Sequence, residues 1–360
     1  TARIVVSRTD TTGAPLDAAS SAGSTQASTS WNFAEGYAGV TFQEYLSIFN
    51  PGSAPAHVQI HYLPTSGKPP APLSYTVPAT GRQSVNVSGL YLLRTSVHAP
   101  KSIALQVTSD QPIVADRTLY WGAGAGSGKY GYDITPGTSG TINAPGAPGA
   151  PGAPGGATNL VFAALVRTGA NEPYITVLNP NATRTSLQIV FRSASGQVLV
   201  SYTTSVAPLA RLTVSLRALV PKYTGVVSAT LNATEPVVAE APLYLGGSPN
   251  IGRHPGLSIL GIVGSNRAAV AGIDATNATL YLYNPGNSTL HVTGQVGASG
   301  GNSGTGTLTV PPLSITIASL PGGSGPRGLL LSAGAPFVAE LINGSASTPA
   351  VWGGTLLPPQ

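Results

Sequence analysis

One strand-and-turn pattern occurs three times along this chain. In each copy an apolar strand runs into Asn-Pro, and about 60 residues later a segment of the form Pro-x-x-x-acid closes the unit. A period of roughly 100–130 residues is the length of one β-sandwich, so the pattern predicts three β-sandwich domains in series. Such arrays are more typical of scaffolds than of catalysts. The recurring residues are Asn50, Pro51 and Asp116, then Asn179, Pro180 and Glu240, then Asn284, Pro285 and Glu340.

Within the copies, apolar and polar residues alternate with a period of two, which is typical of half-buried strands. Residues 56–62 and 186–190 show this alternation clearly. The Asn-Pro pairs between strands indicate turns, because Pro sets φ for a bend and cannot continue a ladder. No segment has helical periodicity over three turns, so we expect an all-β protein with only short helical turns near residues 90–94 and 216–219.

The composition favours a protein that works outside the cell. Charged residues make up only 8% of the chain and hydrophobic residues 42%, whereas ordinary soluble domains are about 25% charged. Surface polarity must therefore come from Ser, Thr, Asn and Gln, which suits an exposed extracellular polymer. The chain has no Cys and no Met, which excludes disulfides and thiolate metal sites. The lack of oxidisable sulfur fits an extracellular life, with a G+C-rich codon bias as the alternative explanation, and the missing initiator predicts a secreted product whose targeting segment has been removed.

The distribution of charged and apolar residues argues against two classes of partner, nucleic acid and the membrane interior. The net charge is +5, but the 17 Lys and Arg residues are scattered rather than gathered in a run. Nucleic-acid binding needs a basic stripe that neutralises phosphates, so we expect no nucleic-acid partner. No apolar run approaches the 18 residues of a spanning helix, so we expect no membrane span.

The changes in composition divide the chain into an arm, a linker and three domains. The repeated Ala-Pro-Gly triplets favour a polyproline-like spacer, although they also resemble a very short collagen segment. We predict an N-terminal arm over residues 1–30 with a strand-like run at residues 3–7, a first sandwich over 31–141, an Ala-Pro-Gly linker over 142–157, a second sandwich over 158–262 and a third over 263–360.

The opening of the first copy carries a family resemblance. It reads Trp31-Asn32-Phe33-Ala34-Glu35-Gly36, followed by Tyr45-Leu46 and Asn50-Pro51. This order resembles the Trp-x-Phe-Ala-Glu-Gly, Tyr-Leu, Asn-Pro signature of repeat domains in large secreted bacterial cell-surface proteins, most clearly over residues 31–122. The resemblance implies three tandem immunoglobulin-like β-sandwich domains with an extended N-terminal arm and no established chemistry. The later copies lack the opening motif, so only their core strands share the resemblance.

No constellation of residues predicts catalysis, a cofactor or a metal. His57 and His61 share a strand face, but four residues of strand separate them by about 13 Å, too far for one ion. Each copy has one recurring acid, whereas glycoside hydrolysis needs two carboxyl groups across a cleft. We interpret these acids as strand ends that accept hydrogen bonds from backbone or from an arginine such as Arg82 or Arg211. The Gly-x-Gly-x-x-Gly match at residues 126–131 lacks the following helix that a phosphate site requires.

Covalent glycans are a further candidate partner. Asn-x-Ser/Thr sequons are only slightly more numerous than chance predicts, and Ser/Thr-linked sugar on residues 9–30 is an equal alternative. The candidate glycosylation sites are Asn86, Asn181, Asn232, Asn277, Asn287 and Asn343.

Two functions are compatible with these features. The first is an extracellular structural subunit that self-assembles into a filament, a pilus-like fibre or a surface layer. In this hypothesis the assembly strand at residues 3–7 adds to a sheet edge of a neighbouring subunit and places Ile4, Val5 and Val6 against it. The same strand could instead fold back onto its own domain. The second function is an adhesin or a glycan-binding accessory module of a secreted protein.

Overall fold

The computed structural model describes the chain in segments separated by gaps. The predicted Ala-Pro-Gly linker lies almost entirely outside the described residues. Three other segments do so as well: the assembly residues Ile4, Val5 and Val6, the Gly-rich stretch after Trp121, and the candidate Asn277. The described residues are 7–11, 18–22, 24, 27–39, 42–94, 101–121, 131–139, 156–168, 171–244, 256–273, 278–298, 303–320, 327–343 and 352–355.

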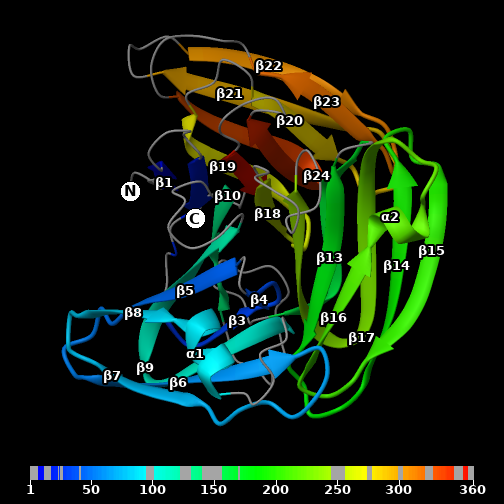
Figure 1. Ribbon diagram of the computed structural model, residues 1–360. Coiled ribbons are helices and arrows are strands. Elements are labelled where there is room, and N and C mark those ends of the chain that lie inside the picture. The colour runs from blue at the N-terminus through cyan, green and yellow to red at the C-terminus, as the bar shows by residue number, and fades with distance from the viewer. Residues whose placement is uncertain are drawn as a thin grey trace.

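The described chain is all-β, as predicted, with three antiparallel sheets that each contain one copy of the pattern (Figure 1). We call these units repeat 1 (β3–β11), repeat 2 (β12–β18) and repeat 3 (β19–β25). Two of the sheets are strongly curled, into nearly closed barrel-like bodies. Repeat 1 contains β3 (Ser28–Phe33), β4 (Tyr37–Ala38), β5 (Phe42–Phe49), β6 (Ala56–Pro64), β7 (Leu73–Val77), β8 (Arg82–Asn86), β9 (Lys101–Trp121), β10 (Gly131–Pro136) and β11 (Thr138–Ser139).

The other two repeats follow the same strand order. Repeat 2 contains β12 (Ala157–Arg167), β13 (Glu172–Asn179), β14 (Thr185–Ser193), β15 (Val198–Val206), β16 (Ala210–Ser215), β17 (Gly225–Tyr244) and β18 (Gly256–Leu260). Repeat 3 contains β19 (Ser265–Ile273), β20 (Ala278–Tyr283), β21 (Leu290–Ala298), β22 (Ser303–Val310), β23 (Ile315–Ser319), β24 (Arg327–Asn343) and β25 (Trp352–Thr355).

One long strand organises each repeat. In repeat 2 the first half of β17 pairs with β12 and β14, and its second half pairs with β13 and β18. The strand changes partners around Pro236, which suits a residue that has no N–H to donate to a ladder. Pro112 in β9 and Pro336 in β24 lie at the same crossing. The recurring acids therefore lie inside long strands, which corrects the prediction that they end strands.

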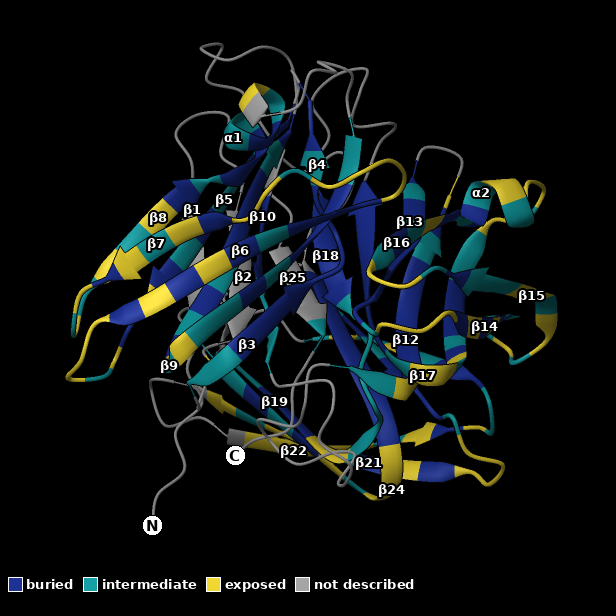
Figure 2. Cartoon of the chain, turned by 90° about the horizontal axis from the view of Figure 1, so that it is seen from below, coloured by how far each residue is buried: buried dark blue, intermediate teal, exposed yellow. Residues whose placement is uncertain are grey.

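Each repeat has its own core, where inward residues from both halves of its long strand meet. Repeat 2 has the largest core, with Phe162, Phe191 and Leu231 completely buried. Trp31 and Phe33 belong to the core of repeat 1, and Phe337 belongs to that of repeat 3. In Figure 2 the buried stretches follow the central strands, while exposed stretches gather at turns and at outer strands such as β7.

The Asn of each Asn-Pro pair ties two loops together. Asn50 is completely buried, and its Nδ2 donates to the carbonyl oxygens of Ala54, Val77 and Pro78 at 2.8, 3.2 and 3.1 Å. Its Oδ1 accepts from the Gly52 N–H at 2.9 Å. An amide side chain supplies two donor hydrogens and a separate acceptor oxygen at one position, as these contacts require. Asn179 and Asn284 make the same four kinds of contact in their repeats.

The two described helices are short, in the places that the sequence predicts. Helix α1 (Val87–Arg94) begins after Asn86, whose Oδ1 accepts from the Gly89 N–H, and α2 (Leu216–Leu219) begins after Ser215, whose Oγ accepts from Ala218. Such side chains satisfy backbone donors that a helix start leaves free. Neither described helix has the length and apolar character needed to cross a lipid bilayer.

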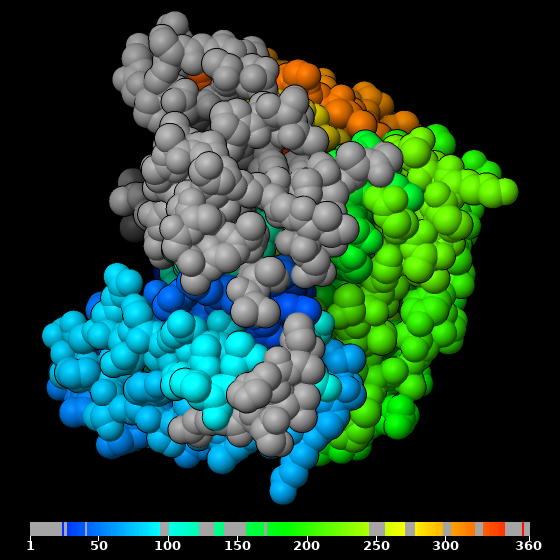
Figure 3. Space-filling view, in the orientation of Figure 1, coloured from blue at the N-terminus to red at the C-terminus, as the bar shows by residue number. Residues whose placement is uncertain are grey.

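The described part of the N-terminal arm forms a hairpin. Strand β1 (Ser7–Thr11) pairs with β2 (Ala18–Ala22), and the first strand of repeat 1, β3, begins at Ser28. Repeat 2 contacts both repeat 1 and repeat 3 (Figure 3). Hairpin strands meet at the centre, where β10 contacts β18, β18 contacts β25, β25 contacts β2, and β2 contacts β10.

Candidate functional site

Two of the recurring acids, Glu240 and Glu340, join one repeat to the preceding one. Glu340 of repeat 3 is completely buried, and its two carboxylate oxygens accept from the N–H groups of Ala163 and Ala164 in repeat 2, at 2.6 and 2.7 Å. These N–H groups are available because β12 has a bulge between Phe162 and Leu165, which interrupts its ladder. Glu340 thus satisfies two buried backbone donors that the ladder leaves unpaired.

Glu240 makes the equivalent contact between repeats 2 and 1. Its Oε1 accepts from the Ala34 N–H at 2.7 Å, just after β3 ends at Phe33. Its Oε2 accepts from Arg117 Nη2 at 2.8 Å, and both side chains are fully buried. The second oxygen of Glu240 therefore accepts from an arginine of repeat 1, whereas the second oxygen of Glu340 accepts from another backbone N–H.

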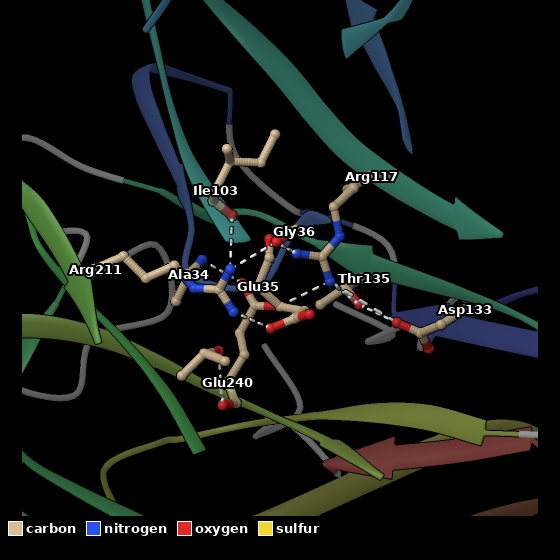
Figure 4. A network of polar contacts seen from close by, with 10 residues as sticks. Ala34, Glu35, Gly36, Ile103, Arg117, Asp133, Thr135, Arg211 and Glu240 are labelled. Carbon is tan, nitrogen blue, oxygen red and sulfur yellow. Dashed lines mark hydrogen bonds and ion pairs between the residues drawn. The ribbon is translucent and has the colours of Figure 1, made fainter. Parts of the chain in front are cut away.

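A second arginine crosses the same junction in the opposite direction (Figure 4). Arg211 of repeat 2 places Nη2 2.5 Å from Glu35 Oε2 in repeat 1. Its Nη1 donates to the carbonyl oxygens of Gly36 at 2.6 Å and Ile103 at 3.2 Å. Arg117 also donates to the carbonyl oxygen of Glu35. The two arginines therefore hold the chain from Ala34 to Gly36 from both sides.

Asp133 and Thr135 in β10 complete the network. Thr135 Oγ1 donates to Asp133 Oδ2 at 2.5 Å and accepts from Arg117 Nη2 at 3.1 Å. Both residues are buried. The junction therefore gathers side chains from β9, β10, β16 and β17 around the turn between β3 and β4.

Glu44 is the fourth buried acid of this junction and has no hydrogen-bond partner for its carboxylate among the described residues. A Cβ added to Gly36 would meet both carboxylate oxygens at 2.8 Å, so the carboxyl group lies directly against this glycine. Burial raises the pKa of Glu44 to about 8, although nearby Arg117 opposes the shift. The side chain is therefore largely protonated at neutral pH.

Burial also raises the pKa of Glu340 and of Glu35. It raises the pKa of Glu340 to about 7, against the opposing effect of the two backbone N–H groups. It raises the pKa of Glu35 as well, and Arg211 and Arg117 counteract this shift. Burying a charged group costs free energy unless hydrogen bonds or an ion pair replace its contacts with water. The stability of both junctions is therefore sensitive to the loss of a partner.

These contacts can fix the angle between repeats, and they leave the carboxyl groups enclosed by protein. Apolar side chains surround both acids: Leu178 and Val238 pack against Ala34 of repeat 1, while Tyr283 and Val338 pack against Val161 and Ala163 of repeat 2. Within the described residues, no group of three or more His, Asp or Glu side chains is placed to hold a metal ion.

The two arginines that were expected to bind the recurring acids, Arg82 and Arg211, lie in different environments. Arg211 lies in the junction but pairs with Glu35, not with the recurring acid, whereas Arg82 is exposed and donates to Ser84 at 3.4 Å. The partner of Glu240 is Arg117, which the sequence analysis did not single out. Its position directly after Asp116, inside the recurring segment, was the available signal.

The candidate glycosylation residues differ in access. Asn86 and Asn181 have their side-chain amides engaged, Asn86 as the start of α1 and Asn181 with Asn179 and Pro236. Asn232 and Asn287 are exposed, and Asn343 is the last residue of β24. Among Asn86, Asn181, Asn232 and Asn287, Asn287 in the turn after Pro285 is the most open to modification, because Asn232 Oδ1 accepts from Asn159 at 2.7 Å.

The predicted histidines lie on the outer surface of β6. His57 is exposed and its Nδ1 lies 2.7 Å from Asp110 Oδ2, which lowers the pKa of Asp110. His61 is half-buried, and burial lowers its pKa. They form no joint site.

Comparisons with known proteins identify a family but no activity. The chain matches the family described as a family of unknown function (DUF5719) over residues 2–321. No curated protein matches it. A structure of Thermotoga maritima 1070 is 21% identical over 31% of this chain and 95% of that one, with a TM-score of 0.24, and the Anabaena sensory rhodopsin transducer is 30% identical over 25% and 92%, with a TM-score of 0.22. Both are partial similarities to small β-domains.

Proposed function

Because the chain belongs to the DUF5719 family, whose function is unknown, we propose from its own residues that it is a structural protein of the cell exterior that associates with copies of itself. Its repeats would be immunoglobulin-like sandwiches related to those of large secreted bacterial surface proteins, as the motif at residues 31–36 indicates. The assembled form would be a filament, a pilus-like fibre or a surface layer.

The observation that carries this proposal is the chemistry of the outer strands. Strands β7, β15 and β22 lie at equivalent edges of the three repeats, and each pairs with a single neighbour. Their sequences, LSYTV, VLVSYTTSV and SGTGTLTV, contain no Lys, Arg, Asp, Glu or Pro. Proteins that avoid association protect their edges with charges, prolines or bulges. Strand β15 has one bulge near its start, between Val198 and Val200, but none of the three edges carries a charge or a proline. Such edges can pair with the edge of another molecule through backbone hydrogen bonds.

The buried polar groups support a structural role. Glu240, Glu340, Arg117 and Arg211 all connect repeats, so the most distinctive ionisable groups serve the architecture. Assembly by edges does not require the assembly strand at residues 3–7. Its described residue, Ser7, pairs with Ala22 of the same chain.

The test places one charge on each of two outer strands. Thr203 in β15 and Thr307 in β22 are exposed, so Thr203→Lys with Thr307→Lys adds edge charge without disturbing a core. We expect the wild-type chain to form ordered assemblies in electron micrographs and to sediment as large species, and the double variant to sediment as a monomer. The matched control is Thr203→Ser with Thr307→Ser, which should assemble.

A wild-type chain that stays monomeric at all concentrations would contradict self-assembly. Selective binding by that monomer on a glycan array would then favour the adhesin or glycan-binding function.

A further inference from the structure

Each repeat carries three side chains at the same place in its sheet, on three neighbouring strands that are aligned by register. We call each set a junction triplet. The triplets are Phe49, Arg82 and Val114 in repeat 1, Leu178, Arg211 and Val238 in repeat 2, and Tyr283, Ile315 and Val338 in repeat 3.

The triplets of repeats 2 and 3 are buried against the preceding repeat. In repeat 2, Leu178 and Val238 pack on Ala34 of repeat 1, and Arg211 binds Glu35. In repeat 3, all three members pack on residues of repeat 2. None of these six side chains is more than 7% exposed.

The triplet of repeat 1 is uncovered. Phe49 is 43% exposed, Arg82 is exposed and Val114 is half-buried. A large aromatic side chain on this surface is unusual, because its equivalents Leu178 and Tyr283 are at most 1% exposed. The surface therefore has the composition of a junction without a preceding repeat.

The N-terminal hairpin occupies the matching place in the ring of hairpins. Ser7 pairs with Ala22 in β1–β2, as Glu240 pairs with Leu260 in β17–β18. The equivalent pairs are Asp116 with Pro136 and Glu340 with Thr355. Strand β2 contacts β10 on one side and β25 on the other, and β1 contacts β19 of repeat 3. Each of the four hairpins thus has two neighbours around the centre.

The sequence of this hairpin agrees with its place. Residues 4–9 read Ile-Val-Val-Ser-Arg-Thr, and residues 113–118 read Ile-Val-Ala-Asp-Arg-Thr. In this alignment Ser7 stands where the other repeats have their recurring acid.

We propose that the exposed triplet of repeat 1 is the docking surface for a fourth repeat of the same fold, of which β1–β2 is the closing hairpin. Strand β1 corresponds to the second halves of β9, β17 and β24, and each of these is continuous with its first half. The other strands of the fourth repeat therefore lie on the N-terminal side of β1. By analogy with Arg211, Arg82 meets a carboxylate and carbonyl oxygens at the first turn of that repeat.

The first test supplies the missing strands. Residues 157–236 of repeat 2 are fused in front of Ile4, which stands at the position of Val237, to give a chain with four complete repeats. The natural chain has no cysteine, so Phe49→Cys gives a single thiol whose rate of reaction with a maleimide reports exposure. We expect the fusion to slow this reaction at least tenfold. Val114→Cys repeats the measurement with Phe49 intact, and Ile317→Cys, at a side chain that is 48% exposed in repeat 3, should react equally in both chains.

Several outcomes overturn the proposal. Equal reaction rates at residue 49 with and without the fused strands would do so, and so would fused strands that lack hydrogen-exchange protection beside a native body. Slower reaction of the unfused 360-residue chain at high concentration, together with dimers in sedimentation, would assign the surface to a second copy.

The second test uses the hairpin alone. In β19 a bulge lies between Val270 and Ile273, as in β12 between Phe162 and Leu165. An acid at position 7 should therefore reach the N–H groups of Ala271 and Gly272, as Glu340 reaches Ala163 and Ala164. We expect Ser7→Glu to raise the urea midpoint more than Ser7→Gln does. Equal midpoints for the two variants would refute the assignment of β1–β2.

Discussion

The two junctions both bind an otherwise unpaired backbone N–H of the preceding repeat, but they use different additional contacts. Glu240 and Glu340 stand at the same position and accept N–H groups from the same interrupted strand of the preceding repeat. The first junction adds Arg117, Arg211 and a salt bridge to Glu35, whereas the second adds apolar contacts, a second backbone donor and a hydrogen bond from the Ile315 N–H to the Ala194 carbonyl oxygen at 2.8 Å. The common element is the acid that accepts a backbone N–H where the first strand of the preceding repeat ends or is interrupted. The arginines are an addition specific to one junction.

The largest expected effect tests whether the arginines are essential where they occur. Arg211→Met leaves the buried Glu35 carboxylate without its ion-pair partner, so we expect a loss of about 3–5 kcal/mol in the free energy of unfolding. Urea denaturation measures it. The matched control is Arg82→Met at the equivalent exposed position, with a change below about 0.5 kcal/mol. Equal effects of the two changes would show that the junction contacts add nothing.

The next effect concerns the acid without an arginine. Glu340→Ala leaves the N–H groups of Ala163 and Ala164 unpaired in a buried site, and we expect a loss of about 2–4 kcal/mol. Thermal and urea unfolding give the value, with the exposed Glu235→Ala as control. A loss as small as that of the control would mean that the remaining contacts hold repeats 2 and 3 together without Glu340.

A pH series compares the protonated acids. The pKa of Glu44 is about 8 in the folded chain and ordinarily 4.5, so between these values the folded state binds more protons than the unfolded state. Stability therefore falls as pH rises, by about 2 kcal/mol between pH 6 and pH 8 from this group alone. Glu340, with a pKa of about 7, adds to the slope below pH 7. Glu44→Gln should flatten the upper part of the curve, and an unchanged slope would exclude Glu44 as its source.

The smallest expected loss of stability concerns contacts that lie within a repeat and not between repeats. Asn50, Asn179 and Asn284 bind the same loop groups in each repeat. Each Asn→Ala change should therefore cost a similar amount, about 1–2 kcal/mol beyond the loss of packing. Measured values that differ as strongly as the two junctions do would show that these loops are not independent of the junctions.

Sequence reasoning reached the features that depend on local patterns. Alternation with a period of two gave the all-β class, and the Asn-Pro pairs marked real turns, because both signals lie within a few residues. The role of Asn50 was missed, since its partners Val77 and Pro78 lie in another turn. The junction was missed for the same reason, because Ala34 and Glu240 are 206 residues apart and no alternation pattern records such a contact.

The direction of the junctions has a consequence for how the chain acquires its structure during synthesis. Repeat 1 leaves the ribosome long before Glu240, so the N–H of Ala34 stays hydrated until β17 has been synthesised. The same holds for Ala163, whose acceptor Glu340 follows 177 residues later in the chain. Closure of such long loops is slow compared with the formation of neighbouring hairpins. Individual repeats should therefore mature first, and their mutual orientation should be set last.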